Sequence, residues 1–171
     1  LFGLRRPQLY GVIAQESAGP VAGPAAPELP VATLLPPESG EGALTWLPTA
    51  VASLPPATAL AVLPGLFCYA QVTDCDEQDA IALGQRALAA MSAACKDRPG
   101  LLLCTSLVLP VGAGSSIAAV LVDENGLQAQ QRQLHASAAY AAHEPGEELQ
   151  LVDLPWGRLA MLAGDDAVVP E

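Results

Sequence analysis

The sequence predicts an α/β fold built around a mixed β-sheet, and three observations support this prediction. Apolar segments of strand length alternate with two segments of helical pattern between residues 30 and 109. Asn125-Gly126 then joins two further strand-like segments, which is a strong signal for a β-hairpin. Hydrophobic residues make up 51% of the 171 residues, which is sufficient for one core of domain size.

The first part of the chain separates into a short strand, an arm and two further strands. Residues 9–14 predict a short strand, and residues 15–30, rich in Pro, Gly and Ala, predict a linker or an extended arm. Strands are then expected at 30–35 and 58–64. The second of these is a continuous apolar run, as expected of a strand that is covered on both faces.

The first helix is expected from about Glu41 to Ser53. Ser39 is a candidate N-cap, and Pro55-Pro56 stops the helix. Pro48 lies inside this segment and predicts either a kink or two short turns, because proline removes one helical hydrogen bond.

The second helix, residues 77–96, has the clearest pattern in the chain. Acidic residues begin it, and Lys96 and Arg98 close it, where positive charge complements the helix dipole. One apolar stripe runs along it and contains Ile81, Leu88, Met91 and Cys95.

The remaining strands are expected to pair mainly as hairpins. They cover residues 101–109, 115–123, 127–134, 149–155 and 158–163, with a loop at 135–148 and a turn at Trp156-Gly157. The order of strand, helix, strand, helix, strand and then hairpins predicts a mixed sheet.

The charge and the cysteines narrow the class of protein. A formal net charge of −11 repels phosphate backbones and anionic lipid surfaces, so nucleic-acid and membrane partners are not expected. No signal-peptide pattern follows Leu1, and no apolar stretch approaches a membrane span. The four cysteines, Cys68, Cys75, Cys95 and Cys104, lack metal-binding spacing. Reduced thiols in the cytoplasm are therefore expected, with a Cys68–Cys75 disulfide as the alternative.

Three segments, in order, resemble the first half of the nitrilase, or carbon–nitrogen hydrolase, superfamily. They are LAVLPGLFCYA (60–70), AAVLVDENGLQAQQRQLH (118–135) and EPGEELQLVDLPWGRLAMLAGDDAVVPE (144–171). In the family, comparable segments carry a glutamate base, a lysine and a nucleophilic cysteine. The resemblance covers Pro30 to Glu171 and implies an α-β-β-α sandwich that is incomplete in this chain.

The resemblance implies two regions in the chain. Residues 30–171 form the N-terminal half of a nitrilase-like domain, and residues 1–29 form an N-terminal arm or linker. RRPQLYG (5–11) is also similar to the closing segment of several family members. Residues 1–14 are thus either the tail of a preceding nitrilase-like unit or an unrelated basic turn.

Carrying the three motifs across gives no catalytic residue. Gly65 stands at the glutamate position, Gln133 at the lysine position and Gly164 at the cysteine position. A second family glutamate falls near Ala139 or Tyr140. Three substitutions within a retained apolar framework predict a scaffold without its chemistry.

No other residue is expected to replace the missing groups. The one lysine, Lys96, lies at a helix end, and Cys68 would need His135 or His143 as its base. Cys68 is expected to be a packed apolar side chain, as are Cys95 and Cys104. His143-Glu144 supplies no complete metal-ligand set, so no metal or cofactor is expected.

Asp165 and Asp166 are interpreted separately. Asp166 is expected to accept backbone N–H bonds around the turn, and Asp165 to face solvent. A catalytic carboxylate pair is the alternative, but adjacent strand residues point to opposite faces if the turn has not yet begun.

The sequence thus favours a catalytically degenerate, nitrilase-like domain that acts as a structural or regulatory partner. Homo- or hetero-oligomers with a nitrilase-like chain are implied, with contacts through the helical faces. A remnant pocket of Cys68, Tyr69, His135, Asp165 and Asp166 is expected to hold a small amide or carboxylate.

Two alternatives stay open. The chain is a fragment or subunit of a carbon–nitrogen hydrolase that acts on amides or nitriles, with active residues from another copy or chain. Otherwise it is a ligand sensor fused to another module. In each case the exposed sheet edge is expected to be paired by a partner chain or by the missing half.

Overall fold

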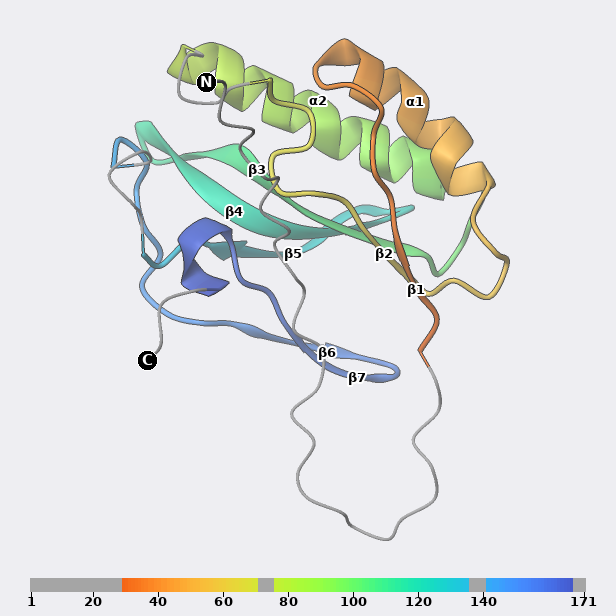
Figure 1. The fold of residues 1–171 in the computed structure, drawn as a ribbon. Helices are drawn as coiled ribbons and strands as arrows, with labels where there is room; N and C mark the ends of the chain where they lie inside the picture. Colours follow the sequence, from red (N-terminus) through yellow and green to blue (C-terminus); the bar gives the residue numbers. More distant parts are fainter. Residues whose placement is uncertain (1–28, 71–75, 136–140, 168–171) are drawn as a thin grey trace, which may run out of the picture.

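The computed structural model describes residues 29–70, 76–135 and 141–167, and its centre is a five-stranded mixed sheet (Figure 1). The strands pair in the order in which they occur in the chain. The first three are parallel, and the last two pairs are antiparallel. They are β1 (Val31–Thr33), β2 (Leu60–Val62), β3 (Leu102–Val111), β4 (Gly114–Asp123) and β5 (Gly126–Arg132). The prediction of an α/β fold with a mixed sheet is therefore confirmed.

Helices α1 (Glu41–Ala52) and α2 (Glu77–Cys95) lie side by side on one face of this sheet (Figure 1). Along the chain, each helix connects two successive parallel strands, because a parallel pair requires a crossover connection. In α2, Ile81, Met91 and Cys95 of the predicted stripe are buried. Leu88 is half-buried and packs against the core.

One expectation about α1, its N-cap, was wrong. The helix is a single one of 12 residues that includes Pro48, which excludes the alternative of two short turns. The ring of Pro48 is on the exposed side, while Leu47 and Val51 are buried beside it and hold the helix to the core. The N-cap is Gly40 instead of Ser39. Gly40 has φ 68°, and its N–H donates to the carbonyl of Cys68 at 2.8 Å.

The two ends of α2 differ in their hydrogen-bond partners. Asp76 is the N-cap, and its carboxylate accepts the N–H of Gln78 at 2.9 Å. Arg98 follows the helix but donates to another one. Its guanidinium binds the carbonyls of Val51 and Leu54 at the end of α1, both at 3.0 Å. Arg98 therefore joins the C-terminal ends of α1 and α2 and does more than complement its own helix.

Gly84 permits a close contact between α2 and the sheet. A Cβ at this position would lie 2.1 Å from the carbonyl oxygen of Val108 and 2.8 Å from Oη of Tyr69. No side chain fits there without moving the backbone of β3. The spacing between the helical layer and the sheet therefore depends on this glycine.

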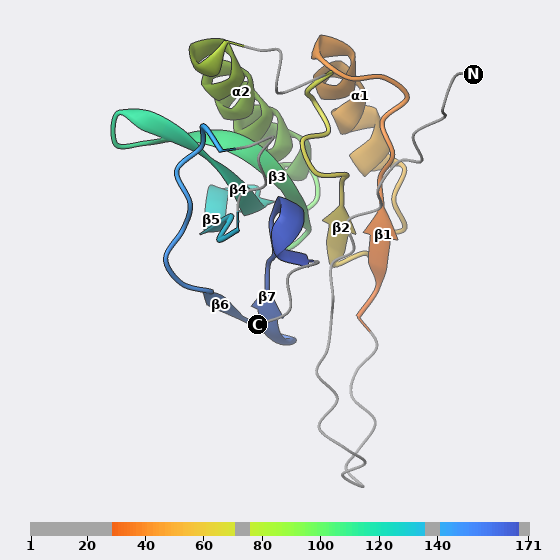
Figure 2. The same ribbon diagram turned by 60° about the vertical axis from the view of Figure 1, so that its left-hand side comes forward.

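A second, two-stranded sheet covers the opposite face of the large sheet (Figures 1 and 2). It consists of β6 (Leu151–Leu154) and β7 (Gly157–Ala160), and a 3₁₀ helix at Gly164–Ala167 follows it. Leu159 and Met161 of this layer belong to the same buried core as β3 and β4. Because helices cover one face and the hairpin the other, eight successive residues of β3 are buried.

The predicted turns occur where glycine permits them. Gly126 has φ 116° and pairs with Asp123 in the hairpin of β4 and β5. Gly157 has φ 146° and pairs with Leu154 across the turn of β6 and β7. The predicted strand at 9–14 and most of the predicted arm at 15–30 lie outside the described residues. Among the described residues, neither α1 nor α2 combines the length and the apolar character that a membrane span requires.

Candidate functional site

Gln133 is held firmly at the end of β5. Its backbone N–H donates to the carbonyl of Ile117 in β4 at 2.8 Å, and its own carbonyl accepts the N–H of Gly146 at 2.8 Å. Its side chain is buried, and Nε2 donates to the carbonyl of His135 at 2.9 Å. The carboxamide is thus fixed by the segment that follows it.

Gly164 faces this carboxamide directly. It begins the 3₁₀ helix after β7 and has φ 57°. A Cβ on Gly164 would lie 2.6 Å from Nε2 and 3.0 Å from Cδ of Gln133. The Gln133 side chain therefore occupies the space that any side chain at residue 164 would need. Positive φ and lack of space both favour glycine there.

Asp166 connects the same two segments. Its side chain is 2% exposed, and it accepts the N–H of Leu134 at 3.0 Å and that of His135 at 2.7 Å. Nδ1 of His135 lies 3.3 Å from Oδ1 of the same carboxylate. The carboxylate accepts backbone N–H bonds, as expected, but those of the segment after β5 instead of those of its own turn.

Asp165 is partly buried and precedes Asp166 in the 3₁₀ helix. The turn has therefore begun at this point, and the alternation of side chains along a strand does not apply. Consecutive residues of a 3₁₀ helix are rotated by about 120° around its axis. The two carboxylates therefore leave the backbone in different directions.

Gly65 lies at the C-terminal end of β2, in a turn fixed to β3. The carbonyl of Pro64 accepts the hydroxyl of Thr105 at 2.7 Å. The N–H of Leu66, which has φ 56°, donates to the carbonyl of Ser106 at 2.9 Å. Gly65 is thus positioned beside β3. Gln133, in contrast, is hydrogen-bonded to β4, and its side chain fills the space next to Gly164.

Cys68 and Tyr69 lie on the helical side of the sheet. Cys68 is fully buried, and burial raises the pKa of its thiol to about 12. Oη of Tyr69 donates to the carbonyl of Ala80 at 2.9 Å and accepts the N–H of Val108 at 3.2 Å. The residues expected to form the remnant pocket therefore fall into two groups, one at the helices and one around Asp166.

The described thiols are neutral. Burial raises the pKa of Cys95 and of Cys104 to about 12, as it does for Cys68. All three are free, and Cys75, the suggested disulfide partner, lies outside the described residues. A thiol must ionise to act as a nucleophile, so burial works against nucleophilic chemistry at these positions.

Ser115, His143 and Glu77 form a polar cluster that sequence reasoning did not predict. Oγ of Ser115 donates to Oε1 of Glu77 at 2.6 Å and lies 2.8 Å from Nδ1 of His143. Since the hydroxyl proton is directed to Glu77, Nδ1 of His143 carries a proton and donates to Ser115. This order differs from a hydrolase triad, in which histidine accepts the serine proton.

The surroundings of the cluster shift the pKa of His143. Burial lowers the pKa of His143 below its usual value, although the nearby Glu77 acts in the opposite direction. Ser115 is fully buried in β4. Its partners come from α2 and from the segment before β6, so the spacing along the sequence contains no signal for the cluster. The described residues include no group of three or more metal-ligating side chains.

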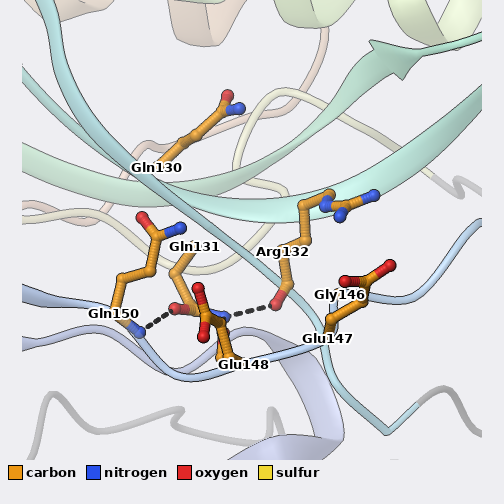
Figure 3. Close-up of a pocket in the computed structure, with 7 residues that line it drawn as sticks. All are labelled: Gln130, Gln131, Arg132, Gly146, Glu147, Glu148 and Gln150. Carbon is orange, nitrogen blue, oxygen red and sulfur yellow. Dashed lines mark hydrogen bonds between the residues drawn. The ribbon is translucent and has the colours of Figure 1, made fainter.

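A polar pocket lies between β5 and the segment that leads to β6 (Figure 3). Gln131 is buried at its base, donates from Nε2 to the carbonyl of Glu148 at 3.0 Å and accepts the N–H of Gln150 at 2.7 Å. Gly65, Gln133 and Gly164 do not line this pocket, which is formed by Gln130, Gln131, Arg132, Gly146, Glu147, Glu148 and Gln150. The second-glutamate position near Ala139 or Tyr140 lies outside the described residues.

Comparison with solved structures identifies the fold. An amidase from Nesterenkonia sp. AN1, with the acetamide moiety of fluoroacetamide attached to its active-site cysteine, matches with a TM-score of 0.64 and 22% identity. The match covers 81% of this chain and 56% of that one. A structure of the same amidase after Michael addition of acrylamide at that cysteine gives 0.57 and 23%, over 78% of this chain and 54% of that one.

A variant of this amidase that is described as coming from the nitrilase superfamily gives a TM-score of 0.61 with 19% identity, over 81% of this chain and 56% of that one. No protein-family model matches the sequence, and no curated protein matches it either. The chain therefore has the fold of nitrilase-superfamily amidases, as the sequence motifs predicted. It spans about half the length of these solved structures.

Proposed function

We propose that this chain is a catalytically degenerate relative of the carbon–nitrogen hydrolases and acts as a structural or regulatory partner of a nitrilase-like chain. The observation that carries the proposal is the contact between Gln133 and Gly164. The carboxamide of Gln133 fills the space in which a side chain at residue 164 would lie. Residues 133 and 164 thus fit against each other in an arrangement that contains no nucleophilic side chain.

Further observations support this proposal. The amidases of the same fold react at an active-site cysteine, whereas the corresponding motif here holds Gly164. Cys68 is the nearest cysteine in the sequence to the glutamate position, and its thiol is buried with a raised pKa. Asp166 is engaged with backbone N–H groups. These observations support a framework that is retained while the motif positions of the thiolate, the base and the cation hold Gly164, Gly65 and Gln133.

The alternative is a fragment or subunit of a carbon–nitrogen hydrolase. The chain spans about half the length of the solved amidases, and this observation favours it. In that case a second copy or another chain supplies the active residues. The two proposals differ in the activity expected of the chain alone and in the effect expected when it is added to an active partner.

The first experiment measures hydrolysis of acetamide and of a simple nitrile by the purified chain. We expect no turnover above the rate without protein. Turnover that persists after replacement of all four cysteines would contradict the degenerate assignment, because no thiol could then be responsible. Addition of the chain to an active nitrilase-like amidase, with a change in its rate or assembly, distinguishes a regulatory partner from an inert scaffold.

A second experiment rebuilds the site. Gly65→Glu, Gln133→Lys and Gly164→Cys are introduced together into a chain without its natural cysteines, with Gly164→Cys alone as the matched control. We expect faster alkylation of the new thiol by iodoacetamide in the triple variant, because a nearby cation lowers the pKa of a thiol. Equal rates in the two variants would mean that these three positions do not form one site.

A further inference from the structure

The carboxamide of Gln133 is buried between two segments of the chain. Gln133 directly follows β5 and is 3% exposed. On one side lies Gly164, where a Cβ would be 3.0 Å from Cδ of Gln133. On another side, the backbone carbonyl of His135 accepts from Nε2 at 2.9 Å. The group is buried within this chain, so additional chain or a partner would only increase its burial.

The backbone around the carboxamide is held by bonds that do not involve this side chain. The N–H of Gln133 donates to the carbonyl of Ile117, and its carbonyl accepts the N–H of Gly146, both at 2.8 Å. The carboxylate of Asp166 accepts the N–H of His135 at 2.7 Å and so fixes the residue whose carbonyl faces Nε2. Because these bonds would remain without the side chain, we expect its removal to leave a cavity that collapses only in part.

The acceptor opposite Nε2 determines which chemical group fits this space. A backbone carbonyl accepts hydrogen bonds and cannot donate one, so the group that faces the carbonyl of His135 must carry an N–H or O–H. A carboxylate would bring two acceptors together and leave the carbonyl without its hydrogen bond. The neighbouring carboxylate of Asp166 is 2% exposed and adds negative charge nearby. A neutral primary amide therefore fits this space, and an organic anion does not.

The size of the space follows from the side chain that fills it. Replacement of Gln133 by alanine removes a CH2–CO–NH2 group, and acetamide has the same heavy atoms as this group. A buried cavity can bind a small molecule that matches the deleted atoms. We propose that Gln133 closes a buried site for a primary amide with its own carboxamide, so that the natural chain excludes small amides from this site. The inference rests on the proposed function, because with Gly164 opposite it the amide is held without reaction.

The first experiment tests whether acetamide stabilises the Gln133→Ala variant of the full chain. The chain is unfolded in urea with and without acetamide, because a ligand that binds only the folded state raises the urea midpoint. We expect acetamide to raise the midpoint of Gln133→Ala more than that of the natural chain. Acetone has the size of acetamide but no N–H. It should bind about tenfold or more weakly, because one hydrogen bond is lost.

A matched variant separates the cavity from the effect of acetamide on the solvent. Gln128 lies on β5, is exposed, and donates from Nε2 to Oδ1 of Asp123 at 2.8 Å. Gln128→Ala removes the same chemical group from the surface, so its midpoint should respond to acetamide as that of the natural chain does. In NMR spectra, acetamide should shift the backbone amide signals of His135 and Gly164 in Gln133→Ala and leave them unchanged in Gln128→Ala.

A second variant tests the preference for an amide without creating a cavity. Gln133→Glu keeps the size of the side chain, but an ionised carboxylate has no hydrogen to donate to the carbonyl of His135. We expect its urea midpoint at pH 7 to be lower than that of the natural chain. The difference should shrink as the pH is lowered, because a protonated carboxyl group donates a hydrogen bond.

Two results would overturn the inference. One is an equal response of Gln133→Ala and Gln128→Ala to acetamide, or an equal response of Gln133→Ala to acetamide and acetone. The other is a Gln133→Glu variant that is as stable as the natural chain at pH 7. Turnover of acetamide is measured separately. Turnover by the natural chain without its cysteines would contradict the proposed function, whereas a lack of acetamide binding by Gln133→Ala would contradict only the inference about this site.

Discussion

The carboxylate of Asp166 accepts the backbone N–H of His135 at 2.7 Å, and this bond fastens the 3₁₀ helix after β7 to the segment after β5. The same carboxylate binds the N–H of Leu134 and is almost fully buried. It therefore holds the two segments that carry Gly164 and Gln133 at their observed separation.

Replacement of Asp166 by asparagine should destabilise the chain. The change leaves the size of the side chain nearly constant but weakens bonds that two N–H groups make to a charged acceptor. We expect a loss of about 1–3 kcal/mol in the free energy of unfolding, measured by urea denaturation. Asp153→Asn disrupts an exposed ion pair with Arg158 and should cost less than about 1 kcal/mol. Equal losses in the two variants would contradict the role assigned to Asp166.

The contact between Gln133 and Gly164 predicts coupling between substitutions at these positions. Gly164→Ala places a methyl group against the carboxamide at a residue with positive φ, and we expect it to cost about 2–4 kcal/mol. Gln133→Ala removes the obstructing group. The double variant should therefore be more stable, by about 1 kcal/mol or more, than the sum of the two single effects predicts. Additive effects in urea denaturation would show that the two side chains do not compete for space.

The lowered pKa of His143 predicts a dependence of stability on pH. Burial disfavours the charged imidazole in the folded chain, so the unfolded chain binds a proton more readily. The resulting stabilisation is fully present above the ordinary histidine pKa of about 6.5 and decreases as the pH falls below that value. Urea midpoints between pH 7.5 and 5 measure this decrease, and His143→Asn should make it shallower. An unchanged slope in that variant would assign the dependence to other groups.

Arg98 should contribute strongly to the packing of α1. Its guanidinium donates to the carbonyls of Val51 and Leu54, which end that helix. Arg98→Met preserves much of the aliphatic contact but leaves these carbonyls without the cation, and we expect a loss of about 2 kcal/mol. Arg86→Met removes an exposed pair with Glu41 and should have little effect. Amide hydrogen exchange in the last turn of α1 should increase only in the Arg98 variant.

The sequence predicted the elements whose signals are local. Helical periodicity with start and stop signals located both helices, apolar runs located the described strands to within a few residues, and Asn125-Gly126 located a hairpin. The N-cap of α1 was missed because it depends on a contact between Gly40 and Cys68, which are far apart in the sequence. The expectation about Arg98 was incomplete for the same reason, since the carbonyls to which its guanidinium donates belong to the other helix.

The site was predicted in part. Motif positions identified Gln133 and Gly164, but only the structure shows that one occupies the space of the other. Cys68 and Tyr69 were grouped with Asp166 because their segments adjoin the motifs, whereas their contacts are with the helices and β3. Ser115, His143 and Glu77 were not recognised as a cluster, because three separate elements bring them together.

The arrangement of the large sheet also has a consequence for how the chain folds. β3, β4 and β5 follow one another through tight turns, so their pairing closes only short loops. A whole helix separates β1 from β2 along the chain, and another separates β2 from β3. These parallel pairs therefore close longer loops and are expected to form later. We therefore expect the antiparallel meander to form first and to serve as the template on which the parallel edge assembles.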